Sequence, residues 1–191
     1  MNLKKFLFPT TQQKKDARRK TKRKKSESVF AKVLFVDPGL GGTGFAYFDH
    51  IVTGGTKPEA PKKFDMYSSK ITDWEKKSLD VALWFESIFF TLKPNHVILE
   101  FPEFWEMSLK SNTAVRGGGL FKLAYLTGTL GMVSFQRTKK EPTLIAPRDW
   151  KGQLPKDSVK RRIQLRFPQL EGIRDHETDA IGMGLSAQDI L

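Results

Sequence analysis

Residues 31–48, AKVLFVDPGLGGTGFAYF, decide how the rest of the chain is interpreted. The apolar run 33–36 is typical of a strand buried on both faces. Asp37 ends this run, and a glycine-rich turn then leads to a second apolar run at 45–48. The stretch therefore predicts a hairpin of two strands with a carboxylate at its mouth.

Two other interpretations of this stretch are open. Gly39, Gly41 and Gly44 have the spacing of a dinucleotide-binding loop, but that loop requires a helix to begin at the glycines, whereas residues 45–48 have the pattern of a strand. A solvated aspartate beside glycines is also common in hairpins that have no chemical role.

Composition limits the class of protein. A chain of 191 residues suits one domain with a core of its own plus an appendage. The absence of cysteine excludes disulfides and thiolate metal sites and fits a reducing compartment. No run of 18 apolar residues occurs, so we expect no segment that spans a membrane.

Basic residues are concentrated at the start of the chain. Residues 1–25 contain 11 Lys or Arg and one acidic residue, within a net charge of +12 for the whole chain. We expect residues 1–28 to form a disordered basic tail that attracts a polyanion, and residues 29–191 to form the folded domain. A solubility or targeting segment is the alternative for this tail.

The remaining patterns predict alternating strands and helices. Strands are expected at 64–68, 96–100 and 143–146. Helices are expected up to Leu92, with Thr72 or Asp73 as the cap, at 120–135, at 156–167 and from His176 onward. The strand 96–100 again ends in an acid, Glu100. The chain is therefore expected to be an α/β protein with two buried strands that end in carboxylates.

Two segments combine cations with aromatic rings. The loop after Glu100 carries Phe101, Phe104, Trp105, Lys110 and Arg116. These side chains suit base stacking and phosphate contact, or they pack the loop onto the body of the protein. A second basic cluster lies on and before the helix 156–167, and its candidate DNA contacts are Lys151, Lys156, Lys160 and Arg161.

The acidic residues suggest a metal site. On the last helix, His176 shares a face with Asp179, as does Asp175. Carboxylates gathered with those of Asp37 and Glu100 would repel one another unless a divalent cation neutralised them, and oxygen ligands favour Mg²⁺ or Mn²⁺. Two such ions suit phosphoryl displacement on a nucleic acid. Acids at a helix N-terminus that only complement its dipole are the alternative.

In three motifs the chain resembles the RuvC family of Holliday junction resolvases, within the ribonuclease H-like superfamily. The family pattern D-P-G-x-x-x-T-G corresponds to residues 37–44, and the Glu that closes an inner strand corresponds to Glu100 in VILE. The terminal pattern [DH]-x-x-D-A corresponds to residues 176–180. The order and separation of the three motifs also agree.

This resemblance implies a mixed five-stranded sheet flanked by helices and a Mg²⁺-dependent crossover junction endodeoxyribonuclease. Asp37, Glu100, His176 and Asp179 would hold two Mg²⁺ ions, for which Mn²⁺ would substitute, with Asp175 as an alternative to His176. Hydrolysis would leave a 5′-phosphate and a 3′-hydroxyl. Lys151 and Lys156 would contact the cleaved strand and stabilise charge on the phosphate.

The resemblance also implies partners. The substrate would be a four-way DNA junction, nicked on two opposed strands by a homodimer whose interface includes the helix 120–135. Phe104, or its neighbours Phe101 and Trp105, would enter the junction. No membrane partner and no small-molecule cofactor are expected. Such a protein would be intracellular and DNA-associated, in the cytoplasm of a bacterial or phage-infected cell rather than in an organelle.

Two rival functions compete with this hypothesis. One is a different ribonuclease H-like nuclease that acts on other branched DNA, flaps or RNA·DNA hybrids. The other is a non-catalytic junction-binding protein whose acids are vestigial. A two-lobed sugar-kinase or actin-like ATPase is excluded, because residues 29–191 are too few to form its second lobe.

Overall fold

A computed structural model describes residues 28–53, 59–102 and 117–189 of the protein. Its centre is a sheet of five strands in the order β3-β2-β1-β4-β5. The first three strands in the chain form an antiparallel meander, and β4 and β5 run parallel to β1. The strands are β1 Ser28–Asp37, β2 Thr43–Thr53, β3 Lys63–Tyr67, β4 His96–Glu100 and β5 Thr143–Ile145.

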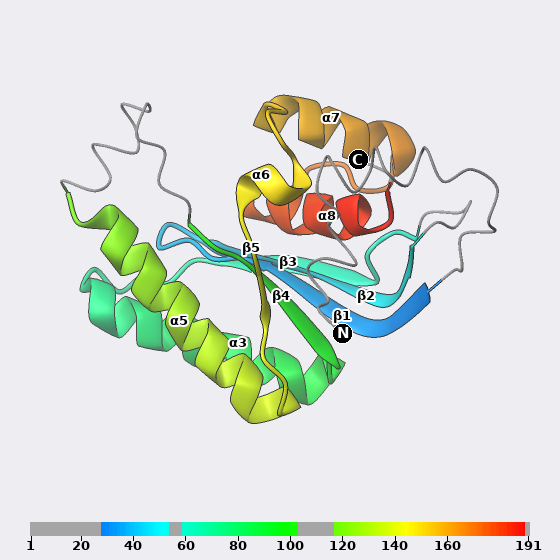
Figure 1. Ribbon diagram of the computed structural model, residues 1–191. Coiled ribbons are helices and arrows are strands. Elements are labelled where there is room, and N and C mark those ends of the chain that lie inside the picture. The colour runs from blue at the N-terminus through cyan, green and yellow to red at the C-terminus, as the bar shows by residue number, and fades with distance from the viewer. Residues whose placement is uncertain (1–27, 54–58, 103–116, 190–191) are drawn as a thin grey trace.

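Helices cover both faces of the sheet (Figure 1). Two long helices lie on one face, and three shorter ones, which come last in the chain, lie on the other. The first pair is α3 Trp74–Leu92 and α5 Gly119–Thr138; the second group is α6 Pro147–Trp150, α7 Lys156–Arg166 and α8 Asp175–Ala187. The predicted mixed five-stranded sheet flanked by helices is confirmed.

The two helix layers explain why β1 is uniformly apolar. Val33 and Phe35 pack into the core beneath α7 and α8, whereas Leu34 and Val36 pack into the core beneath α3 and α5. All four side chains are fully buried. A central strand between two helical layers has no polar face, so the sequence shows no alternation there.

The start of α3 follows its predicted signals. Asp73 is the N-cap, and its carboxylate accepts a hydrogen bond of 2.9 Å from the backbone N–H of Lys76.

None of the described helices is long and apolar enough to cross a membrane.

Candidate active site

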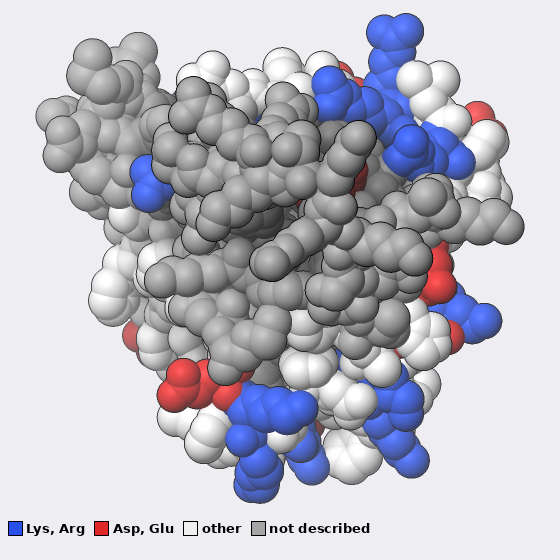
Figure 2. All heavy atoms as spheres, turned by 45° about the vertical axis from the view of Figure 1, so that its right-hand side comes forward, with Lys and Arg blue, Asp and Glu red and all other residues white. Residues whose placement is uncertain are grey.

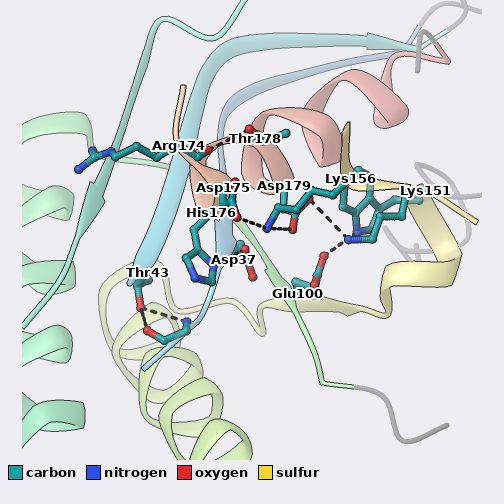
Figure 3. A network of polar contacts seen from close by, with 12 residues as sticks. Asp37, Thr43, Glu100, Lys151, Lys156, Arg174, Asp175, His176, Thr178 and Asp179 are labelled. Carbon is teal, nitrogen blue, oxygen red and sulfur yellow. Dashed lines mark hydrogen bonds and ion pairs between the residues drawn. The ribbon is translucent and has the colours of Figure 1, made fainter. Parts of the chain in front are cut away.

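The site lies at the edge of the sheet where the parallel strands β1 and β4 end. Val36 pairs with Leu99 in this register, so the residues that follow them, Asp37 and Glu100, come to the same edge. The N-terminal half of α8 crosses this edge and adds His176 and Asp179 (Figure 3). The structure thus brings together four residues that are far apart in the sequence.

A tight turn lets α8 approach the sheet. The Thr43 hydroxyl donates a hydrogen bond of 3.1 Å to the carbonyl oxygen of Gly39. The backbone N–H of Gly39 in turn donates a hydrogen bond of 3.3 Å to the Thr43 hydroxyl oxygen. A Cβ atom on Gly39 would lie 2.5 Å from Cε1 of His176, and one on Gly44 would overlap the His176 backbone. The glycines are therefore required by the close passage of α8. Because strand β2 rather than a helix follows them, a dinucleotide-binding loop is excluded.

Asp37 and His176 form a close pair. Asp37 Oδ2 lies 2.6 Å from His176 Nδ1, and the aspartate is 6% exposed. Burial raises the pKa of Asp37, although the hydrogen bond and charge of His176 oppose this shift. The hydrogen bond to Asp37 in turn raises the pKa of His176, although burial of the ring opposes this shift.

Asp179 faces two lysines. Lys156 Nζ lies 3.1 Å from its Oδ2, and Lys151 Nζ lies 3.5 Å from its Oδ1. Burial alone would lower the pKa of Lys156, but the charge of Asp179 and neighbouring carboxylates outweighs that effect and raises it. Asp179 Oδ1 is buried and accepts no hydrogen bond, and the charge that it faces is the ammonium group of Lys151.

Glu100 is held from another side of the site. Trp150 at the end of α6 donates its indole N–H to Glu100 Oε2 at 2.7 Å. Burial, followed by the charge of Asp37, raises the pKa of Glu100 to about 8, despite the opposing charge of Lys151. A carboxylate whose ionised form is this disfavoured is one that a bound cation would stabilise.

The donor set fits a hard divalent cation such as Mg²⁺. Among residues 28–53, 59–102 and 117–189, no three carboxylate or imidazole groups stand in a coordinating arrangement. Two lysine ammonium groups lie beside Asp179 instead. Asp179 Oδ1, which is buried without a hydrogen bond, and the carboxylates of Asp37 and Glu100, whose pKa values are raised, are nevertheless groups that a bound cation would stabilise. Binding would require the two ammonium groups to move off Asp179.

The two alternative ligands at the start of α8 differ in position. The imidazole of His176 lies against Asp37, inside the site. The Asp175 side chain is 73% exposed and lies 3.7 Å from Lys156 Nζ, at the rim. His176 is therefore the better placed of the two to share an ion with Asp37.

The predicted DNA contacts fall into two groups. Lys160 and Arg161 lie on α7, and Lys and Arg side chains gather at the top of the face in Figure 2, the end where α7 lies. Phe101 directly follows the site and is 41% exposed. The other predicted contacts and the tail lie outside the described residues: Phe104, Trp105, Lys110, Arg116 and residues 1–27.

Two features of the site escaped the sequence reasoning. One is the hydrogen bond from Trp150 to Glu100, and the other is the packing of Gly182 against the Trp150 ring, where a Cβ atom would lie 2.6 Å from Cζ3. The available signal was a tryptophan just before a candidate catalytic lysine, together with a glycine inside the terminal helix. These signals gain meaning only when α6, α8 and β4 are placed together.

No family model and no curated protein matches the sequence. Solved structures do match. Two of them are of RuvC from Thermus thermophilus. One matches with a TM-score of 0.58 at 15% identity, over 83% of this chain and 92% of that chain. The other, "in complex with Holliday junction substrate", matches with a TM-score of 0.59 at 13% identity, over 82% of this chain and 92% of that chain. The yeast mitochondrial Holliday junction resolvase Ydc2 matches with a TM-score of 0.52 at 14% identity, over 83% of this chain and 78% of that chain. The fold is therefore the ribonuclease H-like fold of these RuvC structures.

Proposed function

We propose that this chain, which has the RuvC fold, is a metal-dependent endonuclease that resolves four-way DNA junctions by paired nicks. The observation that carries the proposal is the meeting of three buried or half-buried carboxylates with His176 and two lysines at one edge of the sheet. Structural neighbours described as a Holliday junction resolvase and as bound to Holliday junction substrate support the choice of DNA.

Each group of the site has a distinct task in this proposal. Asp37, Glu100 and Asp179, with His176, would hold two Mg²⁺ ions, which supply water activation and charge stabilisation to phosphodiester hydrolysis. The ring nitrogen of His176 that binds an ion must carry no proton, so the imidazole has to be neutral in the metal-bound site. Lys151 and Lys156, once displaced from Asp179, would bind the scissile phosphate and stabilise the charge that develops on it.

The outer face of the α3–α5 pair supports a homodimer. Along α3 and α5, large apolar side chains spaced by three, four or seven residues share one face of each helix and are 41% to 68% exposed: Leu79, Leu83, Phe90, Phe121, Tyr125, Met132 and Phe135. Gly128 lies within this stripe, with no described atom within 4 Å of the place of its missing Cβ. A second copy is the expected occupant, because two opposed nicks require two sites related by a twofold axis.

A test of the dimer compares Leu83→Glu with Lys160→Glu, a change on α7 outside the stripe. Sedimentation equilibrium should show the Leu83→Glu protein as a monomer and both the parent and the Lys160→Glu protein as dimers. A monomeric parent at micromolar concentration would contradict the proposed interface.

Cleavage assays on matched substrates test the reaction itself. In Mg²⁺ the protein should nick a four-way junction symmetrically and leave linear duplex intact, and Asp37→Asn should bind the junction without cutting it. Equal cleavage of duplex, flap or RNA·DNA hybrid would favour the broader nuclease alternative. A parent protein that binds junctions but cuts none in Mg²⁺ or Mn²⁺ would favour a binding protein.

A further inference from the structure

Trp150 connects one of the proposed metal-binding carboxylates to the helical layer. It is the last residue of the four-residue helix α6, is 5% exposed, and donates its indole N–H to Glu100 Oε2 at 2.7 Å. The partners are 50 residues apart in the chain. A buried indole N–H requires an acceptor, and here the acceptor is the carboxylate itself.

The ring of Trp150 is held in place by α8. Ser186 donates its hydroxyl to the Trp150 carbonyl oxygen at 2.9 Å, so the backbone of α6 is tied to α8. The ring lies against Gly182, where a Cβ atom would come within 2.6 Å of Cζ3 and 3.0 Å of Cη2. A glycine and a serine on α8, the helix that carries Asp179, thus hold Trp150 in position.

The face of the same ring contacts the ammonium group of Lys151. Lys151 Nζ lies 4.8 Å from the centroid of the Trp150 ring and 3.5 Å from Asp179 Oδ1. A single side chain therefore contacts Glu100 through its N–H and Lys151 through its π face. Both contacts fix the positions of groups that the proposed reaction uses.

We infer that Trp150 is a positioning residue, which fixes the Glu100 carboxylate through Oε2 so that its other oxygen is presented to a divalent ion. This inference rests on the proposed metal-dependent function. Partners that orient metal ligands in this way typically change metal affinity by about 10- to 100-fold when they are removed. The contact to Lys151 uses only the ring, so it should survive replacement of the indole by a phenyl ring.

The test uses the full chain and the variant Trp150→Phe, which keeps an aromatic ring and removes the N–H. The control is Trp84→Phe, the same chemical change in a ring that stacks on Tyr67, 5.0 Å away, on the opposite helical layer. Calorimetric titration with Mn²⁺, without DNA, should show affinity about 10-fold or more weaker for Trp150→Phe and unchanged for Trp84→Phe. With a junction substrate, kcat at low Mg²⁺ should fall for Trp150→Phe, recover at high Mg²⁺, and leave KM for DNA unchanged.

A second measurement leaves Trp150 intact. In a ¹H–¹⁵N spectrum, the indole resonance of Trp150 should move in Glu100→Ala, while those of Trp74 and Trp84 stay in place. The inference is overturned if the folded Trp150→Phe protein binds Mn²⁺ with the parental affinity. It is also overturned if the Trp150 indole resonance is unchanged in Glu100→Ala. Neither the Mn²⁺ titration nor the indole resonance involves DNA. If both give the expected result in a protein that cuts no DNA, the proposed nuclease function is wrong and the positioning role of Trp150 stands.

Discussion

Replacing Glu100 by Gln should make the metal-free protein more stable at alkaline pH. The pKa of Glu100 is about 8 in the folded protein, against 4.5 for an ordinary glutamate, mainly because of burial and the nearby charge of Asp37. Between these two values the unfolded chain has lost the proton and the folded chain retains it. The free energy of unfolding therefore decreases as the pH rises from about 4.5 to about 8.

The size of this effect follows from the same pKa difference. Each tenfold change in proton affinity corresponds to about 1.4 kcal/mol, so the full effect on the wild type is on the order of 5 kcal/mol above pH 8. The amide of Glu100→Gln has nearly the same volume, offers an oxygen to the Trp150 N–H and carries no charge at any pH. The variant should therefore escape this loss of stability.

Urea unfolding in EDTA at pH 5, 7 and 9 measures the difference in unfolding free energy between the two proteins. We expect the advantage of Glu100→Gln to grow by several kcal/mol from pH 5 to pH 9. In Mg²⁺ the order should reverse at pH 9, because a bound ion stabilises the ionised glutamate in the wild type only. A difference in stability that is the same at pH 5 and pH 9 would refute the assignment of a raised pKa to Glu100.

Three further predictions concern other parts of the molecule. Gly44→Ala should destabilise the fold by several kcal/mol in thermal or urea unfolding, because its Cβ would overlap the His176 backbone. Gly41→Ala, where the Cβ meets no described atom, should lower the unfolding free energy by less than about 1 kcal/mol. Equal effects of the two changes would show that α8 does not pass over this turn. Lys156→Ala should reduce the cleavage rate at saturating junction about 10-fold or more and lower the slope of log affinity against log salt by about one, as measured by filter binding at several salt concentrations; an unchanged rate would remove Lys156 from the site. Removal of residues 1–25, which carry 11 cations, should weaken DNA affinity and flatten its salt dependence while turnover at saturating DNA is retained, and loss of metal-dependent turnover would contradict a purely electrostatic role for this tail.

The sequence predicted the features of the fold that depend on local patterns. The uniformly apolar run 33–36 indicated a strand covered on both faces, and the structure places α3 and α5 on one side of it and α7 and α8 on the other. Asp37 and Glu100 could be expected at one edge because each ends a strand, and parallel strands end at the same edge. On α3, the helical spacing of Val81, Phe85 and Ile88 correctly indicated its buried face.

Features that depend on contacts between distant elements could not be predicted in this way. Nothing in the segment around Trp150 indicates that its indole reaches Glu100, because that contact needs the placement of α6 against β4 and a glycine on α8. The second apolar stripe of α3, which includes Leu79 and Leu83, was hidden because a helix with apolar residues on two faces shows no clear polar side. The pairing of Lys151 and Lys156 with Asp179 likewise depends on how α7 packs beside α8.

The most direct test of the account is anomalous diffraction from a crystal of the full chain soaked in Mn²⁺. We expect two ions about 4 Å apart, contacted by Asp37, Glu100 and Asp179. His176 should have turned from its hydrogen bond into the site, and the ammonium groups of Lys151 and Lys156 should have moved off Asp179. Manganese bound elsewhere, with the lysine pairs to Asp179 and the bond between Asp37 and His176 intact at saturating Mn²⁺, would contradict it.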